Sequence, residues 1–303
     1  MRNKDTKIDE MMLYNLFIFA DDSCKMIKNY VDYHWLEQEN KPFRKPKRLA
    51  LSESETITIL VYYHYSGYKN FEYYYKQFVL TDLKTYFPQA PSYTHFLELE
   101  SRVSILMPLI MQLTCENASR SQIYFADSKR IPVCDNLRIS SHKVFKQTGA
   151  RGKSSTGWFY GFKAHLVINN WGQIISFRLT AANKSDNNSD ILVKLFSNLK
   201  GMCIADKGYI TKLWQQFYEN GLKIVHKIKK NMKNKLLLLE EKYYLNKRGV
   251  IESVNDILDS VFNLTHSRYR KPENAFCSIC ACLIAYQFYP DKPSVYYHDN
   301  KQK

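Results

Sequence analysis

Helical periodicity characterises the N-terminal part of the chain. Ser52-Glu-Ser-Glu55 has the spacing of a capping box, in which the first Ser and the last Glu each bind the other's backbone N–H. Apolar residues, including Ile57 and Leu60, then recur every three to four positions until Gly67. The same spacing predicts a helix with a basic tail over residues 1 to about 50, and helices over about 70 to 78 and 92 to about 111. We expect a helical region that is either a helix-turn-helix DNA-binding unit or a plain packing domain.

The periodicity changes to that of strands at residue 121. The pattern of apolar and polar residues predicts strands over Ser121–Val133, Trp158–Ile168 and Gln173–Thr180. Asn169-Asn-Trp-Gly172 separates the last two, and its Gly supplies the turn of a hairpin. These segments predict a three-stranded antiparallel meander, with the polar and basic residues 138–157 as a connection.

Helices and strands alternate after the meander. Helices are predicted over residues 191–199, 210–220 and 248–263, and strands over 202–206 and 223–228. The resulting order, β-β-β-α-β-α-β-α, is that of an α/β (α+β) RNase H-like core. In that fold the fourth strand lies parallel to the first. We therefore expect an RNase H-like catalytic core preceded by a helical N-terminal region.

Two of the predicted strands carry an acid. Asp127 follows Phe125-Ala126 in the middle of its strand, and Asp206 follows the apolar run that begins at Met202. Asp is depleted in strands, and α/β sheets place ligand-binding groups where strands end. Each acid alone could be a solvent-exposed residue at a strand end. Two of them in the same setting indicate a site.

The last predicted helix offers a third acid. Glu252, Asn255 and Asp259 stand at positions i, i+3 and i+7, so they share a face beside the apolar stripe. Asp256 is a further acid on the same helix. Spacing alone leaves Glu252, Asp256 and Asp259 open as the third member of the site, and each is also an ordinary solvated helix charge.

The chain is strongly basic. Lys and Arg number 44 against 29 Asp and Glu, which gives a net charge of +15 and a pI near 9.3. This balance favours nucleic acid or an anionic membrane surface as the partner. No stretch reaches the ~18 uncharged apolar residues that a membrane span needs, so no membrane span is expected.

The cysteines suggest a reducing compartment. The chain has 7, an odd number, scattered from Cys24 to Cys282. This usage is typical of the cytoplasm and not of a disulfide framework. Cys277-Ser-Ile-Cys280 has apolar neighbours and no second pair at zinc-binding spacing, so we interpret these thiols as part of the core.

Basic residues concentrate in separate segments. Lys41–Arg48 contains two prolines and is predicted to be an extended connector, and Lys223–Lys235 holds six Lys and no acid. Each segment is either a solvated surface or a contact with DNA phosphates. Phosphate contacts are predicted for His142, Lys143, Arg151, Lys153, Lys229, Lys230 and Lys233. His165, in an alternating strand, is interpreted as structural.

Several runs of residues resemble the motifs of a known family. They are Asp127-Ser-Lys-Arg-Ile-Pro-Val-Cys134, Arg151-Gly-Lys-Ser-Ser-Thr-Gly-Trp-Phe-Tyr-Gly-Phe-Lys163, Ala205-Asp-Lys-Gly-Tyr209, Lys229-Lys-Asn-Met-Lys-Asn234 and Ile251-Glu-Ser-Val-Asn-Asp256. The chain resembles DDE transposases of bacterial insertion sequences, most closely the group numbered nine-eighty-two. The resemblance is dense over Ser121–Pro293 and looser over Leu51–Phe71, and the first fifty residues match least.

The resemblance implies a triad of Asp127, Asp206 and Glu252 that holds metal ions. Cleaving a phosphodiester and joining its 3′ hydroxyl to another are in-line displacements, and two Mg²⁺ ions stabilise the attacking and leaving oxygens. Mn²⁺ should be able to substitute. Such hard cations prefer carboxylates. Asp127 would bridge the two metal sites, with Asp206 completing one and Glu252 the other.

The expected protein is a transposase that binds terminal inverted repeats and target DNA and performs cleavage and strand transfer. It should act as a homo-oligomer, such as a dimer, in the cytoplasm at the nucleoid. Residues 1–118 would form the helical region with a role in binding DNA ends, 119–293 the catalytic domain and 294–303 a tail. The alternatives are a nuclease of the same fold without strand transfer and an inactive DNA-binding derivative.

Overall fold

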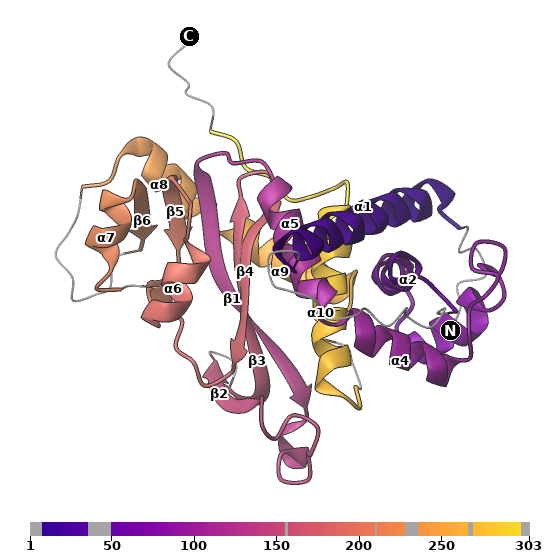
Figure 1. Ribbon diagram of the computed structural model, residues 1–303. Helices are drawn as coiled ribbons and strands as arrows, with labels where there is room; N and C mark the ends of the chain where they lie inside the picture. Colours follow the sequence, from indigo (N-terminus) through magenta and orange to yellow (C-terminus); the bar gives the residue numbers. More distant parts are fainter. Residues whose placement is uncertain are drawn as a thin grey trace. The chain divides into compact units, whose positions relative to one another are not determined.

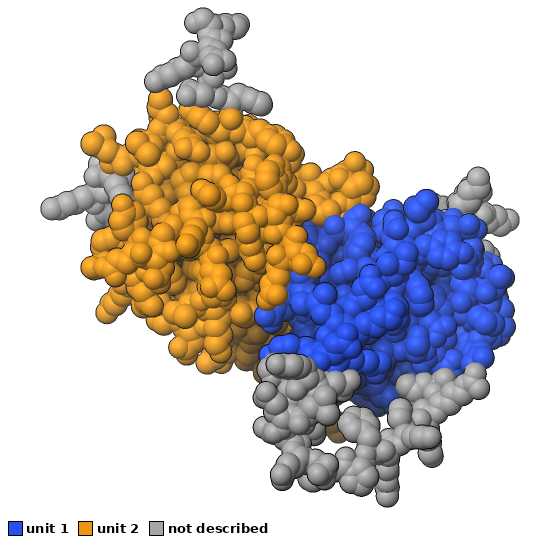
Figure 2. All heavy atoms as spheres, turned by 45° about the horizontal axis from the view of Figure 1, so that its top comes forward, with its two compact units in different colours: residues 1–114, 261–288 blue, residues 115–260, 289–303 orange. Residues whose placement is uncertain are grey.

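The computed structural model describes residues 8–35, 50–154, 157–209, 211–227, 236–265 and 269–297. The chain divides into two compact units, coloured separately in Figure 2. The helical unit comprises residues up to 114 together with 261–288, and the sheet unit comprises 115–260 together with the residues from 289 onward. Residues 261–288, which we had assigned to the catalytic domain, thus group with the N-terminal helices. The functional domain boundaries stay a prediction.

The helical unit is built around one buried helix. Its elements are α1 (Glu10–Trp35), α2 (Glu53–Tyr65), α3 (Phe71–Tyr74), a π-helical turn (Tyr75–Val79), α4 (Tyr93–Val103) and α10 (Pro272–Gln287), and α5 (Leu106–Asn117) runs across the boundary with the sheet unit (Figure 1). Helix α2 packs against α1, α4 and α10. It is buried on nearly every side, as expected of a helix that is apolar all round.

The start of α2 is the predicted capping box. The Ser52 hydroxyl accepts a hydrogen bond from the Glu55 backbone N–H at 3.1 Å, and the Ser52 backbone N–H donates to Glu55 Oε2 at 2.7 Å. Gly67 follows the helix with a φ of 74°, a conformation in the left-handed region that Gly adopts without strain. The predicted beginning and end of this helix are therefore confirmed.

The helix predicted over residues 92–111 is interrupted. Helix α4 ends at Val103 and α5 begins at Leu106. Pro108 explains the break, because proline has no N–H to donate to the carbonyl of residue 104 and its ring clashes with that carbonyl. Only the first turn of a helix accommodates proline, so a new helix begins just before Pro108.

In the sheet unit, the described residues form a six-stranded mixed sheet. The strands are β1 (Ile123–Cys134), β2 (Ala150–Ser154), β3 (Gly157–Asn169), β4 (Ile174–Ala181), β5 (Gly201–Ala205) and β6 (Leu222–His226). Their order is β2-β3-β1-β5-β6, and β4 also pairs with β3. β3 is antiparallel to β1, β2 and β4, whereas β5 is parallel to β1 and β6. The predicted meander and parallel fourth strand are confirmed.

This is the predicted mixed α/β fold, with an RNase H-like core and helices at the N-terminus. Some elements of the sheet unit differ from the expectation. Strand β2 lies inside the predicted connection, and α8 (Leu239–Asn246) precedes α9 (Gly249–Ser260), which is the predicted last helix. Helix α9 is shorter at its C-terminus than predicted, because residue Asn263 adopts a φ of 55°.

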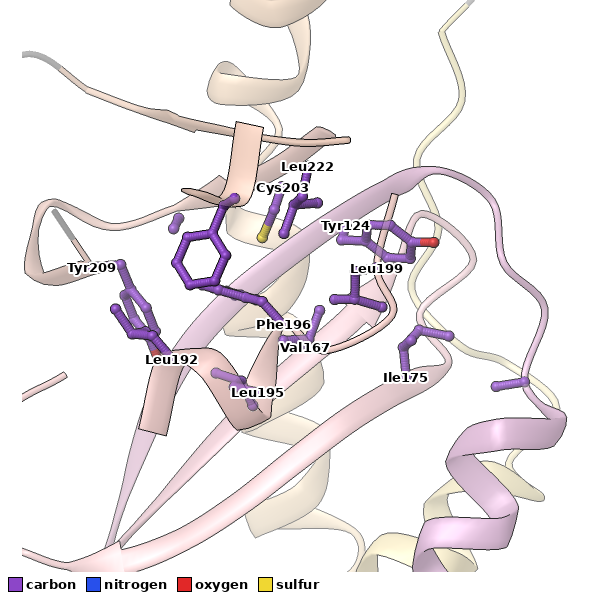
Figure 3. Close-up of a cluster of buried hydrophobic side chains, with 14 residues drawn as sticks. Tyr124, Val167, Ile175, Leu192, Leu195, Phe196, Leu199, Cys203, Tyr209 and Leu222 are labelled. Carbon is purple, nitrogen blue, oxygen red and sulfur yellow. The ribbon is translucent and has the colours of Figure 1, made fainter. Parts of the chain in front are cut away.

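The two faces of the sheet are covered by different helices. On one face, buried residues of α6 (Ser189–Leu195) and α7 (Trp214–Glu219) pack with strand residues such as Tyr124, Val167 and Cys203 (Figure 3). Alternation along β1 turns Phe125 and Asp127 to the other face, where α9 packs. Asp127 therefore lies on the side of β1 that faces α9 and not on the side that faces α6.

Candidate active site

The register of β1 and β5 brings two predicted site residues to neighbouring positions. Ile123 pairs with Met202, and the pairing continues to Ala126 opposite Ala205. The next residue is Asp127 along β1 and Asp206 directly after β5. Asp127 is half-buried, because β1 continues past it alongside β3, whereas Asp206 is exposed where β5 ends. Parallel pairing thus places the two acids at one edge of the β1–β5 pair.

Helix α9 packs against β1 and brings polar side chains to Asp127. Asn255 Nδ2 donates a hydrogen bond to Asp127 Oδ2 at 3.1 Å. One turn further, Asp259 Oδ2 lies 2.5 Å from Nζ of Lys129, a salt bridge in which Lys129 is largely buried. Asn255 and Asp259 therefore share the face of α9 that meets β1, as their spacing predicted.

Glu252 stands on the same helix, one turn before Asn255. Its Oε1 accepts a hydrogen bond from Arg248 Nη2 at 2.5 Å, and 57% of its side chain is exposed. The Arg248 side chain is only 19% exposed. Asp259 is engaged by Lys129, and Asp256 is exposed.

The charges of Arg248, Asp206 and Glu252 act on Asp127. Burial raises the pKa of the Asp127 carboxyl to about 6, the Arg248 guanidinium lowers this pKa, and the carboxylates of Asp206 and Glu252 raise it. The ionised form of a carboxyl that is desolvated beside two other acids is stabilised by a nearby cation and by hydrogen-bond donors. Arg248 supplies part of that positive charge in this structure.

The donor set suits a hard divalent cation. Asp127, Asp206 and Glu252 offer carboxylate oxygens, and buried Asn255 Oδ1 has no hydrogen-bond partner within the described part of the chain. An unpaired buried amide oxygen is a position where a water or an ion would be accepted. In the described ranges, no three acidic, His or Cys side chains are grouped closely enough to form a metal cluster as they stand. Glu252 would have to exchange Arg248 for the cation.

A second polar cluster lies behind Asp206, on the opposite face of the sheet. Tyr209 ends the short helical turn after Asp206, and its backbone N–H donates to the Asp206 carbonyl at 3.0 Å. The Tyr209 ring is buried, and its hydroxyl lies 3.5 Å from His165 Nδ1. Lys163 Nζ lies 3.0 Å from Asp186 Oδ1 in the same cluster. These contacts anchor the turn that carries Asp206.

Buried His165 has a polar partner at each ring nitrogen. Its Nε2 lies 3.0 Å from Thr180 Oγ1, and Nδ1 faces the hydroxyl of Tyr209. Burial lowers the pKa of His165 to about 4, so the ring is neutral near pH 7. This environment agrees with the interpretation of His165 as a structural residue.

The predicted DNA-contacting residues that the structure describes lie before and within β2. Lys143, Arg151 and Lys153 are exposed, whereas His142 is half-buried with its ring stacked 5.6 Å from that of Phe145. His142 therefore packs its own loop. Predicted contacts at Lys229, Lys230 and Lys233, like the connector Lys41–Arg48, lie outside the described residues. Contact with DNA stays a prediction for all of them.

Sequence reasoning missed Arg248 and did not assign Asn255 a partner. Arg248 precedes Glu252 by four residues, the spacing of a helical ion pair, and this signal could have identified it. The partner of Asn255 is 128 residues away in the sequence, so only the packing of α9 on β1 identifies it. The thiols of Cys277, Cys280 and Cys282 are buried within α10, as expected for core residues.

Comparison with known proteins places the sheet unit in a family. The family described as Transposase DDE domain matches residues 117–272, which is more than half of the chain and includes β1, β5 and α9. No curated protein matches the sequence significantly. Every helix in the described ranges is too short or too polar to cross a membrane. The match and the RNase H-like core agree, and the chain belongs to the DDE transposases.

Proposed function

We propose that this protein is a DNA transposase of the insertion-sequence type in which Asp127, Asp206 and Glu252 form the catalytic triad. It would bind the terminal inverted repeats of its element and catalyse metal-dependent cleavage and strand transfer. The motifs quoted above favour the group numbered nine-eighty-two. Action on DNA implies a cytoplasmic protein at the nucleoid, and joining two element ends in one reaction implies a homo-oligomer.

The observation that carries this proposal is the convergence of three elements on Asp127. Parallel pairing of β5 with β1 places Asp206 beside Asp127. Helix α9 carries Asn255, which donates a hydrogen bond to the Asp127 carboxylate, and Glu252, whose charge raises the Asp127 pKa. A buried carboxyl whose pKa is raised by two neighbouring carboxylates is a poor arrangement for stability alone. It is a suitable arrangement for binding positive charge.

The site residues would have different roles in the reaction at the phosphodiester. Asp127, Asp206 and Glu252 would hold Mg²⁺ or Mn²⁺, which stabilises the charge that develops on attacking and leaving oxygens. Asn255 orients the Asp127 carboxylate through its amide N–H group. Arg248 holds Glu252 in place. If Glu252 held a cation, the Arg248 guanidinium would be available to pair with a phosphate oxygen.

Single and combined substitutions of the acids test the proposal. Asp127→Asn, Asp206→Asn and Glu252→Gln each remove one negative ligand and keep the side-chain shape, so folding and DNA binding should persist. Cleavage should fall by several orders of magnitude in each single variant and no further in the triple variant, since the acids act as a unit. The assay measures nicking and covalent joining of element ends to a supercoiled plasmid, with Mg²⁺, Mn²⁺ or Ca²⁺.

Two further variants provide the controls. Asp256→Asn changes an exposed acid of the same helix and should remain active, and Asp259→Asn tests the acid that pairs with Lys129. If Glu252→Gln cleaved DNA while Asp256→Asn or Asp259→Asn in a folded protein did not, the third acid would be misassigned. Cleavage by the unmodified protein without any covalent joining would favour the nuclease.

A further inference from the structure

The β2–β3 hairpin has two chemically different faces. Burial alternates along β2, where Arg151 and Lys153 are exposed and Gly152 between them is buried. A Cβ at Gly152 would lie 2.3 Å from the carbonyl oxygen of Ala182, so this face is in close contact with the end of β4. Phe159 of β3 is buried as well. One face of the hairpin is thus fixed to the sheet unit. On the other face the loop before β2 packs on Tyr160, and the part around Trp158 is open.

An exposed tryptophan lies on the open face, next to the connection between β2 and β3. Trp158 pairs directly with Lys153 across the two strands, and 51% of Trp158 is exposed. The Arg151 guanidinium carbon lies 5.1 Å from the centre of the Trp158 ring, and Lys153 Nζ lies 5.8 Å from it. Both distances are within the range of cation–π interactions. The ring is therefore held by two cations and still presents a large aromatic surface to the solvent.

The surroundings of Trp158 are positively charged. Between residues 136 and 158 the sequence contains Lys and Arg residues but no Asp or Glu. In Figure 1 this segment and β2 lie at one end of the long strands β1 and β3. Such a surface attracts a polyanion, and its exposed aromatic ring can contact a partner that has flat rings of its own.

The open face lies on the same side of β3 as the candidate active site. Strand alternation puts Trp158 on the same side as Leu166, which is the residue paired with Asp127. Phe145 supports this assignment, because it contacts Phe162 of β3 and accepts the hydrogen bond of the Tyr160 hydroxyl at 2.9 Å. Eight residues of strand correspond to roughly 26 Å, a length that one bound DNA molecule can span.

We infer that Trp158 is a stacking residue for an unpaired DNA base, with Arg151 and Lys153 contacting the flanking phosphates. This inference rests on the proposed function. It adds a site that binds an unpaired base as well as the phosphates of the DNA. Phosphate contacts alone would not need a tryptophan. Inside a duplex the faces of paired bases are covered by their neighbours, so a base there can stack on an aromatic ring only after it has left the duplex.

Binding measurements on the full-length chain test the inference in the absence of divalent metal, so that cleavage cannot interfere. The probes are a fluorescent blunt duplex of arbitrary sequence and the same duplex with a short single-stranded extension that contains 2-aminopurine. Trp158→Ala should bind the extended probe about 5- to 100-fold more weakly and leave the affinity for the blunt duplex unchanged. Trp158→Phe, which retains a ring, should recover most of the affinity and the quenching of 2-aminopurine.

Two control variants separate stacking from charge and from folding. Trp214→Ala removes another exposed tryptophan of the sheet unit and should behave like the unmodified protein. Arg151→Gln combined with Lys153→Gln should weaken both probes and flatten the slope of log K against log salt by up to about 2 units. Far-UV circular dichroism should be the same for all variants.

Each remaining outcome overturns the inference. Equal losses on both probes in Trp158→Ala would reduce Trp158 to a support of the hairpin, and unchanged binding would give it no role in recognition. If the protein binds DNA and this binding does not depend on Trp158, the inference fails but the proposed function stands. Failure of the unmodified protein to bind either probe would contradict the proposed function together with the inference.

Discussion

At the scale of single residues, Glu100 is the buried acid whose environment has the clearest consequence for stability. It is 2% exposed in the helical unit and accepts a hydrogen bond from Asn274 Nδ2 at 2.7 Å. Burial raises the pKa of Glu100 from its usual 4.5 to about 8, although the Asn274 hydrogen bond lowers it. The folded protein therefore holds a proton here that the unfolded chain releases near pH 4.5.

The sign of the pH dependence follows from this difference in proton binding. Between about pH 4.5 and 8 the folded state binds more protons at Glu100 than the unfolded state, so the free energy of unfolding should decrease as the pH rises. Glu100→Gln removes this dependence and should stabilise the helical unit at pH 8 by a few kcal/mol. Urea unfolding at several pH values measures it. Parallel pH profiles for the two proteins would contradict the prediction.

The sequence was most informative about the residues whose neighbours are local. Asp127 and Asp206 could be identified because an acid inside or directly after an apolar strand is unusual. The contacts that shape the site are not local, since Asn255 and Lys129 find their partners only when α9 docks on β1. Periodicity indicates which residues share a face, but it does not indicate what that face touches.

At the scale of elements, the turn that carries Asp206 depends on a residue behind the sheet. The Tyr209 ring is buried among residues of the α6 face, close to Leu192 and Phe196 in Figure 3. Tyr209→Ala should remove this anchor, lower the free energy of unfolding by about 3–5 kcal/mol and reduce cleavage, because Asp206 loses its fixed position. Urea unfolding and DNA cleavage at varied Mg²⁺ concentration measure the two effects.

The conservative variant separates the ring from its hydroxyl. Tyr209→Phe keeps the buried ring and loses the contacts of the hydroxyl with Ser128 and with His165, whose 3.5 Å length indicates a weak hydrogen bond. It should lower the free energy of unfolding by less than about 1.5 kcal/mol and retain cleavage. If Tyr209→Phe were as inactive as Tyr209→Ala, the hydroxyl and not the packing of the ring would position Asp206.

The elements that sequence reasoning missed have specific physical causes. β2 reads as Ala-Arg-Gly-Lys-Ser, a polar run whose only inward residue is a glycine, so it lacks the apolar alternation that marks a strand. The pairing of β2 with β3 and the close contact at Gly152 define it instead. The interruption before α5 was predictable from Pro108, because proline in a helix interior removes a backbone hydrogen bond.

At the scale of the whole molecule, the helical unit is discontinuous in sequence. Helix α10 comes from residues 261–288, yet it packs against α2 and α4. Two buried polar pairs join these segments: His64 Nε2 lies 3.0 Å from Ser278 Oγ, and Asn274 binds Glu100. The N-terminal helices, which the sequence suggested as the region that binds DNA ends, are therefore incomplete without α10.

We predict that residues 1–114 alone do not fold cooperatively, whereas the same residues joined to 261–288 by a flexible Gly/Ser linker do. Without α10 the faces of α2 and α4 that it covers would be exposed to water, and Glu100 and His64 would lose their partners. Thermal melts followed by circular dichroism compare the two fragments. A matched third fragment in which Ser278 and Asn274 are both replaced by Leu should fold less stably than the linked fragment, because buried polar groups would be left unpaired. Cooperative melting of residues 1–114 alone, at the temperature of the linked fragment, would show that α10 is dispensable.

Binding of the linked fragment to terminal-repeat and scrambled duplexes of equal length would then test where the element ends are recognised. Equal affinity for both duplexes would move that recognition to the sheet unit or to the assembled oligomer.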